Sequence, residues 1–191
     1  MSHVTLLLLI VLVSAGPVWA KGTSDDIKML RRLLIERLAL MEDVAAYKWN
    51  AGLPIDDPAR EANVHRAAEA RARAAGLAPA RARAFIAAQM EAAKIIQRYH
   101  FDEWRANGVE KIEGVPDLAT DLRPRIGALS RDLIVALAAD LHLLEDCQAA
   151  STLRPAPDAR SGIREAWEVA IGGVLEPDQD CPAAGPANKQ R

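Results

Sequence analysis

The sequence is poor in the residues from which β-sheets, disulfide scaffolds and metal sites are built. Aromatic residues make up 4% of the 191 residues, cysteine occurs twice, and no alternating apolar run is bounded by hairpin signals. These scarcities argue against a β-sandwich or barrel. The four histidines show no ligand spacing and no CxxC motif occurs, so no metal site is predicted. Acidic and basic residues nearly cancel, leaving a formal net charge of −2, which argues against duplex DNA as a partner.

The composition instead favours a helical fold with one core. Hydrophobic residues make up 50% of the chain, and alanine, leucine, arginine and glutamate are abundant. Capping and stop signals divide the chain into five expected helices, at about 24–51, 58–76, 79–107, 122–146 and 158–175. A connector at 109–121 and a break at 154–157 separate the later helices. The sequence therefore predicts an all-α, single-domain bundle of five to six long helices.

The first twenty residues have the pattern of a secretory signal peptide. Residues 4–13 are almost purely apolar, Gly16 and Pro17 interrupt the run, and Ala20 offers a small-residue cleavage site. Cleavage after Ala20 would leave a periplasmic or secreted protein with no membrane attachment. Because residues 2–3 supply no Lys or Arg, an uncleaved anchor is the alternative, although the apolar run is shorter than the ~20 residues that span a bilayer.

The two cysteines lie in the C-terminal part of the chain. In an exported protein, Cys147 and Cys181 are most simply one disulfide. Two unrelated thiols are the alternative. The Pro-containing segment after Cys181, residues 182–191, is expected to form a flexible tail.

The first expected helix carries two cations on its apolar face. Its apolar stripe continues through Arg37 and Lys48, which are 11 residues apart and therefore point the same way. The apolar members of the stripe are Ile27, Leu30, Leu34, Met41 and Ala45. Buried cations are costly unless an anion meets them. They could be paired with acids inside the bundle or extend to its edge; otherwise they bind an anionic ligand.

Other polar residues lie at comparable positions. Arg60 and Glu61 follow a helix start, where anions are favoured. Gln97 shares a stripe with Ile86, so it needs a partner if it is buried; a water-bonded amide at the bundle edge is the alternative. Arg123 begins the fourth expected helix and could equally be a solvated arginine.

The remaining basic and aromatic residues have simpler interpretations. Five arginines of the second and third helices are interspersed with acids and alanine, as on a solvated helical face: Arg66, Arg71, Arg73, Arg81 and Arg83. No aromatic residue lies among them, so a nucleic-acid surface is not predicted. Trp49 and Trp104 are expected to pack between helices.

Two segments resemble the all-helical AroQ class of chorismate mutases. They are ERLALMEDVAAYKWNAGLPIDDPARE at 36–61 and AAQMEAAKIIQ at 87–97. The signal sequence, the added C-terminal region and the cysteine pair resemble the secreted gamma subclass. The spacing Arg-x10-Lys-x11-Arg-Glu is not expected of an arbitrary helical bundle. The resemblance implies that residues 21–181 form one chorismate mutase domain.

The resemblance also implies the role of each site residue. Arg37 and Arg60 would hold the substrate carboxylates, with Arg123 as a further cation. Lys48 would contact a carboxylate and the ether oxygen, and Gln97 would hydrogen-bond the same ether oxygen. The other implied positions are Glu61 at the ring hydroxyl, Asp57 in the same loop, and Val64 and Ala93 as pocket walls. Some relatives have a polar side chain where this sequence has Ala93, so a hydroxyl contact is missing. No role is assigned to the adjacent Lys94.

The implied reaction agrees with the residues present. The conversion of chorismate to prephenate, on the branch toward phenylalanine and tyrosine, is a unimolecular Claisen rearrangement, so no nucleophile, metal or redox cofactor is expected. Positioning of a compact conformer and donors aimed at the developing charge can supply the catalysis. A dicarboxylate needs at least two cations, and arginine matches carboxylates with two parallel hydrogen bonds. We expect these cations to converge in a dry cleft whose acids do not neutralise them.

Two other functions use the same features differently. A periplasmic binding or signalling bundle could hold a small dicarboxylate without chemistry, and a purely interacting helical protein would close the polar stripe with internal acids. The resemblance further implies a homodimer whose active sites are not shared between subunits, although nothing in the periodicity indicates a self-interface.

Overall fold

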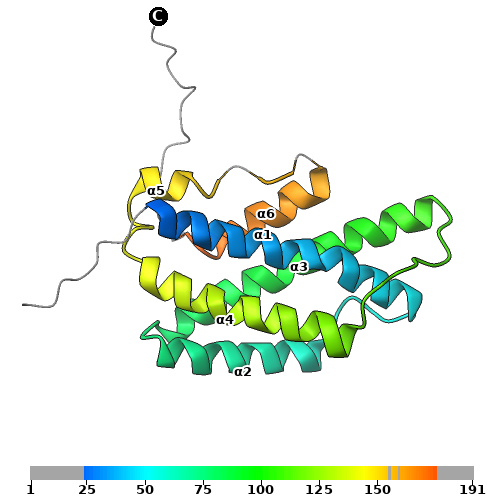
Figure 1. Ribbon diagram of the computed structural model, residues 1–191, viewed down its shortest axis with the longest axis horizontal. Helices are drawn as coiled ribbons and strands as arrows, with labels where there is room; N and C mark the ends of the chain where they lie inside the picture. The colour runs from blue at the N-terminus through cyan, green and yellow to red at the C-terminus, as the bar shows by residue number, and fades with distance from the viewer. Residues whose placement is uncertain (1–23, 155, 159, 176–191) are drawn as a thin grey trace, which may run out of the picture.

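The protein is a bundle of helices. A computed structural model describes residues 24–154, 156–158 and 160–175. Within these residues no strand occurs, and the elements are α1 (Ser24–Asn50), α2 (Pro58–Ala74), α3 (Pro79–Ala106), the π-helical turn η1 (Leu118–Leu122), α4 (Arg123–Asp140), α5 (Cys147–Ser151) and α6 (Ser161–Gly172) (Figure 1). The predicted all-α fold is confirmed. None of the helices in the described ranges is long and apolar enough to cross a membrane.

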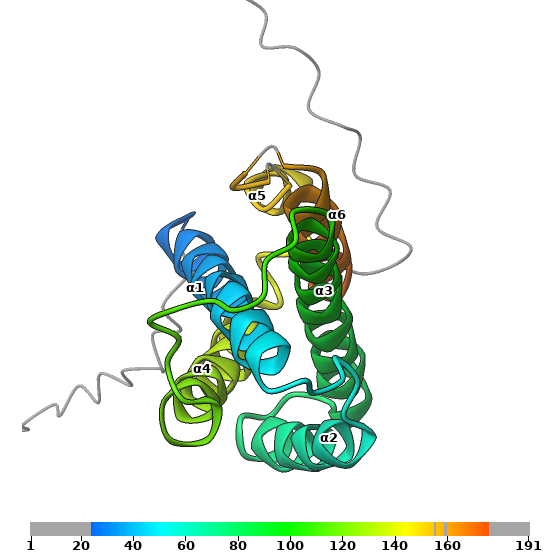
Figure 2. The same ribbon diagram turned by 90° about the vertical axis from the view of Figure 1, so that its right-hand side faces the viewer.

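Four helices surround the centre of the bundle, and α6 lies outside them. Figure 2 shows α1, α2, α3 and α4 around a common interior, with α6 packed along the outer side of α3. Each of α1, α3, α4 and α6 contributes fully buried side chains to the core, among them Leu34, Phe85, Leu137 and Trp167. The Trp167 indole Nε1–H donates to the Leu153 carbonyl at 2.9 Å, so its one polar atom is satisfied.

Local signals explain how α2 begins. Gly52, at φ +61°, ends the turn after α1 in a left-handed conformation that glycine adopts readily. Asp57 then caps α2, because its carboxylate accepts a hydrogen bond from the Arg60 backbone N–H at 3.0 Å. Pro58 occupies the first helical position, where its missing N–H costs nothing. The loop and the cap fix the direction in which the first turn of α2 presents its side chains.

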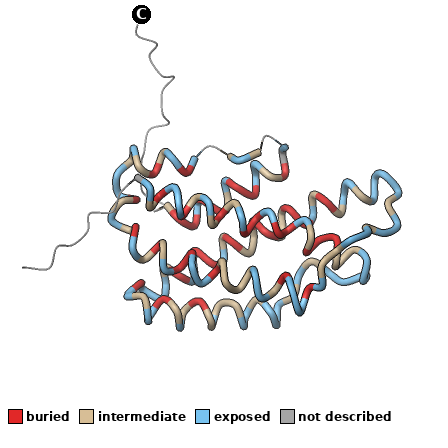
Figure 3. The backbone as a smooth tube through the Cα atoms, viewed as in Figure 1, coloured by how far each residue is buried: buried red, intermediate tan, exposed pale blue. Residues whose placement is uncertain are grey.

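The helix α2 is the least buried wall of the bundle. Its buried residues are Ala68 and Ala72, whereas α3 buries residues along most of its length. Figure 3 shows α2 mostly in the colours of intermediate and exposed residues. Burial of apolar surface supplies most of the stability of a helix in a protein, so α2 is held weakly.

Backbone amides of α2 are therefore expected to exchange hydrogen with solvent faster than those of α3. Hydrogen–deuterium exchange of peptides from Pro58–Ala74 and Pro79–Ala106 measures the difference within one sample. Equal protection of the two helices would contradict the weak anchoring of α2.

The predicted end of the fourth helix is wrong. The expected helix at 122–146 stops at Asp140, and turns occupy 141–146 before α5 begins. Asp146 starts α5 by accepting from the Gln148 backbone N–H at 2.9 Å. The turn allows Leu144 and Leu153 to reach the core, where they are 3% and 0% exposed. Tertiary burial thus overrides a local sequence that would tolerate a longer helix.

Two other predicted boundaries need correction. The expected last helix, 158–175, spans only Ser161–Gly172 in α6. The connector expected at 109–121 contains η1, because the Asp117 carboxylate accepts from the backbone N–H groups of Ala119 and Thr120 at 2.9 and 2.7 Å. Short π-helical turns occur frequently at functional sites, and this one leads directly into Arg123.

Several predictions fall outside the described residues. These are the signal peptide at 1–20, the tail at 182–191 and Cys181, so the disulfide with Cys147 and the domain limits at 21 and 181 stay predictions. Cys147 is the first residue of α5. The packing predicted for Trp49 and Trp104 is confirmed, since their rings meet edge to face at 5.8 Å.

Candidate active site

One cavity of about 270 Å³ lies between α1, α2, α3 and α4. All nine residues predicted to contact substrate line it: Arg37, Lys48, Asp57, Arg60, Glu61, Val64, Ala93, Gln97 and Arg123. They come from four helices and from the loop before α2, so the fold gathers positions that are far apart in sequence. The size is close to the lower end, about 300 Å³, of the usual range for small-molecule sites.

Arg37 is a buried cation without a carboxylate partner. Its side chain is 4% exposed, and its Nη1–H donates to the Gln89 carbonyl at 3.0 Å. The Nε–H donates to Ser130 Oγ at 3.4 Å. Burial lowers the pKa of Arg37 to about 10, which leaves the guanidinium charged at neutral pH. Neutral oxygens hold the group in place, so its charge remains available to an anionic ligand.

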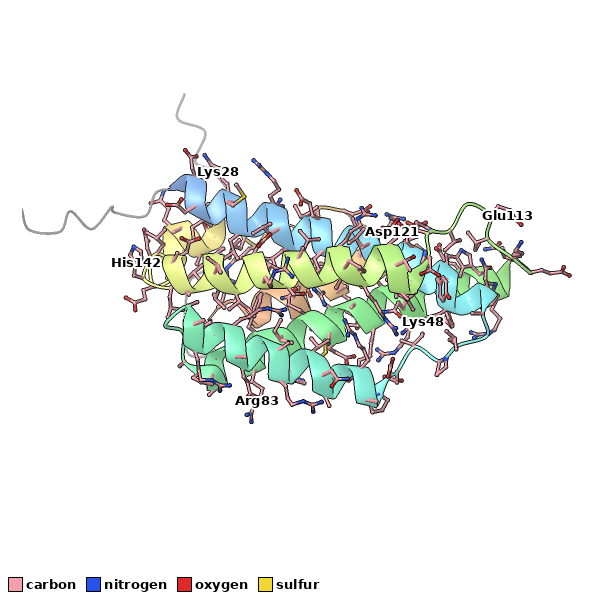
Figure 4. All side chains as sticks on the ribbon, turned by 60° about the horizontal axis from the view of Figure 1, so that its bottom comes forward. Lys28, Lys48, Arg83, Glu113, Asp121 and His142 are labelled. Carbon is pink, nitrogen blue, oxygen red and sulfur yellow. The ribbon has the colours of Figure 1, made fainter. Side chains whose placement is uncertain are left out.

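Lys48 lies at the other end of the α1 stripe. Its Nζ donates to the Ile55 carbonyl at 2.6 Å, which ties the loop before α2 to α1. Partial burial lowers the pKa of Lys48, and the nearby Arg123 lowers it further, while Asp57 acts in the opposite direction. Figure 4 shows Lys48 near the ends of α4 and α2 that face each other. An ammonium whose one short bond is to a carbonyl retains two further N–H donors.

The first turn of α2 presents one cation and one anion to the cavity. The Arg60 guanidinium forms no hydrogen bond or ion pair with any described residue, although the Arg60 backbone is fixed by the Asp57 cap. The Glu61 carboxylate accepts from the Asp57 backbone N–H at 3.5 Å. The cap therefore fixes the backbone from which both side chains extend.

Gln97 is buried, as its position on the apolar stripe of α3 indicated. The side chain is 4% exposed and its Nε2 donates to the Ala93 carbonyl at 3.0 Å. Its Oε1 is buried without a hydrogen-bond partner. A primary amide has two N–H groups, so one donor remains for a ligand. The alternative of a solvated amide at the bundle edge is excluded by this burial.

The expectation of a cleft whose acids neutralise none of its cations needs correction. Arg123 Nη2 lies 3.5 Å from Asp57 Oδ2, and both side chains are about two-fifths exposed. Such a partly solvated pair is weak and can exchange partners when a carboxylate ligand binds. Within the described ranges, Arg37, Lys48 and Arg60 have no carboxylate within ion-pair distance, so this part of the expectation holds for three of the four cations. The expected dryness holds for Arg37 alone, because Lys48 is half-buried and Arg60 is exposed.

Lys94 also faces the cavity, and the sequence analysis assigned it no role. Its Nζ lies 3.3 Å from Asp56, 3.6 Å from Glu61 and 3.4 Å from Glu91. Burial lowers its pKa, but the hydrogen bond to Asp56 and the charges of Glu61 and Glu91 outweigh burial and raise it. The ammonium thereby connects the loop before α2 to α3 and restrains Glu61.

The uniform interpretation of the arginines at 66–83 was also wrong. Arg66, Arg73 and Arg83 are exposed as predicted, but Arg81 donates to the carbonyls of Gly173 and Val174 at the end of α6, and Arg71 lines the cavity. A signal for Arg71 was present in the sequence, because it follows Arg60 by 11 residues, the same three-turn spacing that joins Arg37 to Lys48.

The chemistry available to this cavity is anion binding in a restricted space. Its lining contains six cationic side chains and two carboxylates, together with apolar residues such as Met41, Val44 and Ile126. The residues suit a compact molecule with two negative charges and an apolar framework. Among the described residues, no group of His, Cys, Asp and Glu is arranged to hold a metal ion.

Comparison with known proteins assigns this arrangement to a family. Residues 26–98 match the family model described as chorismate mutase type II. A protein of Enterobacter agglomerans named monofunctional chorismate mutase is 32% identical over 139 residues, which cover 72% of this chain and 76% of that protein. The chain belongs to the chorismate mutase family. The matched residues cover nearly all of α1, the loop after it, α2 and most of α3, and they include eight of the nine predicted site residues.

A further sequence relative and a solved structure also place this chain among the chorismate mutases. A secreted chorismate mutase of Yersinia pestis is 35% identical over 109 residues, which cover 57% of this chain and 58% of the relative's length. The crystal structure of chorismate mutase from Burkholderia thailandensis superposes with a TM-score of 0.69 at 35% identity, covering 78% of this chain and 99% of that one. The AroQ-type helical fold is therefore confirmed, and family membership favours an isomerase over a non-catalytic binding or signalling bundle.

Proposed function

We propose that the cavity between α1, α2, α3 and α4 is the site at which this chorismate mutase converts chorismate to prephenate. The observation that supports it is the convergence of Arg37, Lys48 and Arg60 on one cavity without a carboxylate partner. Arg37 is buried and Lys48 is half-buried, so their uncompensated charges are unfavourable in the free protein, whereas the exposed Arg60 is solvated until a ligand binds. A dicarboxylate substrate supplies the opposite charge.

The arginines bind the two carboxylates of chorismate. Arg37 and Arg60 present guanidinium groups from α1 and α2, and Arg123 adds a third when its exposed pair with Asp57 opens. Two parallel N–H donors on each guanidinium match the geometry of a carboxylate. Holding both carboxylates at once selects the compact conformer in which the reacting carbons approach each other, which removes much of the entropic part of the barrier.

Lys48 and Gln97 stabilise the charge that develops on the ether oxygen. As the C–O bond breaks ahead of C–C bond formation, electron density accumulates on that oxygen, and preorganised donors nearby lower the barrier. The Lys48 ammonium and the second N–H of the buried Gln97 amide are these donors. One C–O bond breaks and one C–C bond forms within the same molecule, so the reaction needs no proton, water or electron from another reactant.

The remaining lining residues fix the orientation of the ring. Glu61, restrained by Lys94 and by the Asp57 backbone N–H, accepts from the ring hydroxyl. Val64 and Ala93 form apolar walls. The methyl group of Ala93 cannot donate a hydrogen bond, so the carboxylate nearest to it depends on the arginines alone.

The direct test of this function is to follow chorismate with purified protein beginning at Lys21. We expect first-order loss of the chorismate absorbance with stoichiometric formation of prephenate, and no requirement for added cofactor. Binding of chorismate without prephenate would instead support the dicarboxylate-binding bundle and would refute the proposed catalysis.

The variant Gln97→Glu is expected to move activity to acidic pH. The Gln97 side chain is 4% exposed, and burial raises the pKa of a carboxyl group placed there. Below that raised pKa the protonated acid donates to the ether oxygen, and above it the carboxylate repels the oxygen, so kcat/KM should fall as pH rises. The measurement is kcat/KM between pH 4.5 and 8, with Gln148→Glu on the exposed surface of α5 as control. An unchanged pH profile would show that Gln97 does not contact the oxygen.

We also propose that the protein is exported and acts as a homodimer with unshared sites. The pattern at residues 1–20 supports export to the periplasm or beyond, as does the word secreted in the name of the Yersinia pestis relative. One chain by itself supplies all nine residues predicted to contact substrate, which supports an active site in each subunit. Mass spectrometry of the exported protein tests cleavage after Ala20, and sedimentation tests the dimer.

A further inference from the structure

The cavity-facing side of α2 carries a second arginine. Arg60, Val64, Ala67 and Arg71 all line the cavity and follow one another at steps of four, three and four residues. This spacing places the four side chains on one face of the helix. Arg71 therefore shares the face of α2 that carries Arg60, rather than the outward face of the neighbouring Arg73.

The guanidinium of Arg71 is not engaged by the protein. It forms no hydrogen bond or ion pair with a described residue, although Arg71 is partly buried. Nearby arginines differ, since Arg66 donates to Asn63 and Arg83 pairs with Glu69 at 2.8 Å. Arg83 is exposed and does not line the cavity, and Figure 4 shows it at the outer edge of the bundle. Arg71 is thus a cation that lines the cavity without an anion of the described residues to meet it.

Arg71 lies near the C-terminal end of α2, whereas Arg60 and Arg123 lie at the end of the cavity where α2 begins. Eleven residues of helix rise by about 16 Å, so Arg71 begins far from Arg60 and from the Asp57–Arg123 pair. Helical side chains lean toward the N-terminus of their helix, which directs Arg71 back along the cavity. On α1 the end of the cavity away from Lys48 is formed by Arg37.

We propose that Arg71 is a substrate-binding residue that adds affinity for the carboxylate held at the Arg37 end of the cavity. The inference rests on the proposed chorismate mutase activity. That carboxylate keeps its charge throughout the rearrangement, so an interaction with it is equally strong in substrate and transition state. Uniform binding of this kind lowers KM and leaves kcat unchanged. Arg71 accordingly sets the preference of the site for a dianion.

The experiment compares R71Q with R73Q, using chorismate as the probe. Both variants lose one positive charge from α2, but Arg73 is exposed and does not line the cavity. We expect R71Q to raise KM about tenfold, the effect of losing one charge-assisted hydrogen bond, with kcat within about twofold of wild type. R73Q should leave both constants within about twofold. The KM of wild type should rise more steeply with salt than that of R71Q.

Each other outcome overturns a specific statement. Equal constants for R71Q and R73Q, with an active wild type, would make Arg71 a solvated surface residue and leave the proposed activity intact. A loss of kcat at constant KM in R71Q would contradict uniform binding. An inactive wild type would refute the proposed activity and this inference together. Thermal melts test whether each variant is folded. If R71Q is unfolded, R71K is used in its place, and we expect its KM to rise about threefold because lysine lacks the two parallel N–H donors of a guanidinium. A wild-type KM in R71K would overturn the inference.

Discussion

Replacing Lys48 by alanine is expected to lower kcat by about 10²- to 10³-fold, the usual effect of removing one preorganised donor from a developing oxyanion. Lys48 faces the cavity and carries its charge in partial burial, where electrostatic interactions are stronger than in water. Because the interaction strengthens as the ether bond breaks, the loss should fall on kcat more than on KM. Chorismate consumption under saturating conditions measures it.

The matched control for this variant is Lys28→Ala. Lys28 lies on the same helix but is exposed and pairs with Asp25 at 2.7 Å on the surface, so its removal should leave kcat unchanged. Thermal melting should show both variants folded, since Lys48 contributes only one hydrogen bond, to the Ile55 carbonyl. A Lys48→Ala variant with wild-type turnover would remove Lys48 from the chemistry.

Replacing Arg60 by alanine is expected to lower kcat/KM by about 10- to 100-fold, because a charge-assisted hydrogen bond to substrate contributes roughly 1.5–3 kcal/mol. The side chain has no partner in the described structure, and the Asp57 cap holds its backbone whatever the side chain is. The protein should therefore stay folded while binding one substrate carboxylate more weakly. Steady-state kinetics with chorismate and a thermal melt provide the two readouts.

The control for Arg60 is Arg66→Ala, two turns further along α2. Arg66 is exposed and donates to Asn63, so its loss changes the net charge equally without touching the cavity. Arg60→Lys should recover only part of the activity, because an ammonium cannot form two parallel bonds to a carboxylate. Equal effects of Arg60→Ala and Arg66→Ala would mean that only the overall charge of α2 matters.

The sequence predicted those parts of the site that depend on local patterns. The helix period placed Arg37 and Gln97 on buried faces, and both are 4% exposed. The Asp57–Pro58 pair predicted the start of α2 within one residue. These features depend on capping and periodicity, which short segments encode. The family resemblance then supplied the roles that periodicity alone could not.

The parts that escaped prediction depend on packing between distant segments. The end of α4 at Asp140 follows from the burial of Leu144 and Leu153, which no local signal announces. The role of Lys94 could not be predicted, because its ion pairs with Asp56 and Glu61 join residues of α3 to residues of a separate segment. Arg71 follows Arg60 at helical spacing, but the charged residues around it in the sequence led to the prediction of a solvated face. Only the packing of α2 in the bundle identifies which of its faces lines the cavity.

The free protein tolerates its cationic cavity through neutral oxygens and through exposure. Two of the five N–H groups of Arg37 donate to the Gln89 carbonyl and to Ser130 Oγ, which holds the side chain in place while preserving its charge. Lys48 uses a carbonyl in the same way. Acids in these places would neutralise the site and remove the driving force for binding a dianion.

The most direct test of the central claim is a crystal structure of the protein with a bicyclic dicarboxylate that mimics the cyclic transition state. We expect its two carboxylates to meet the guanidinium groups of Arg37, Arg60 and Arg123, with the ether oxygen within hydrogen-bond distance of Lys48 Nζ and Gln97 Nε2. An analogue bound outside the cavity, or bound with its carboxylates facing solvent and those side chains still unliganded, would contradict it.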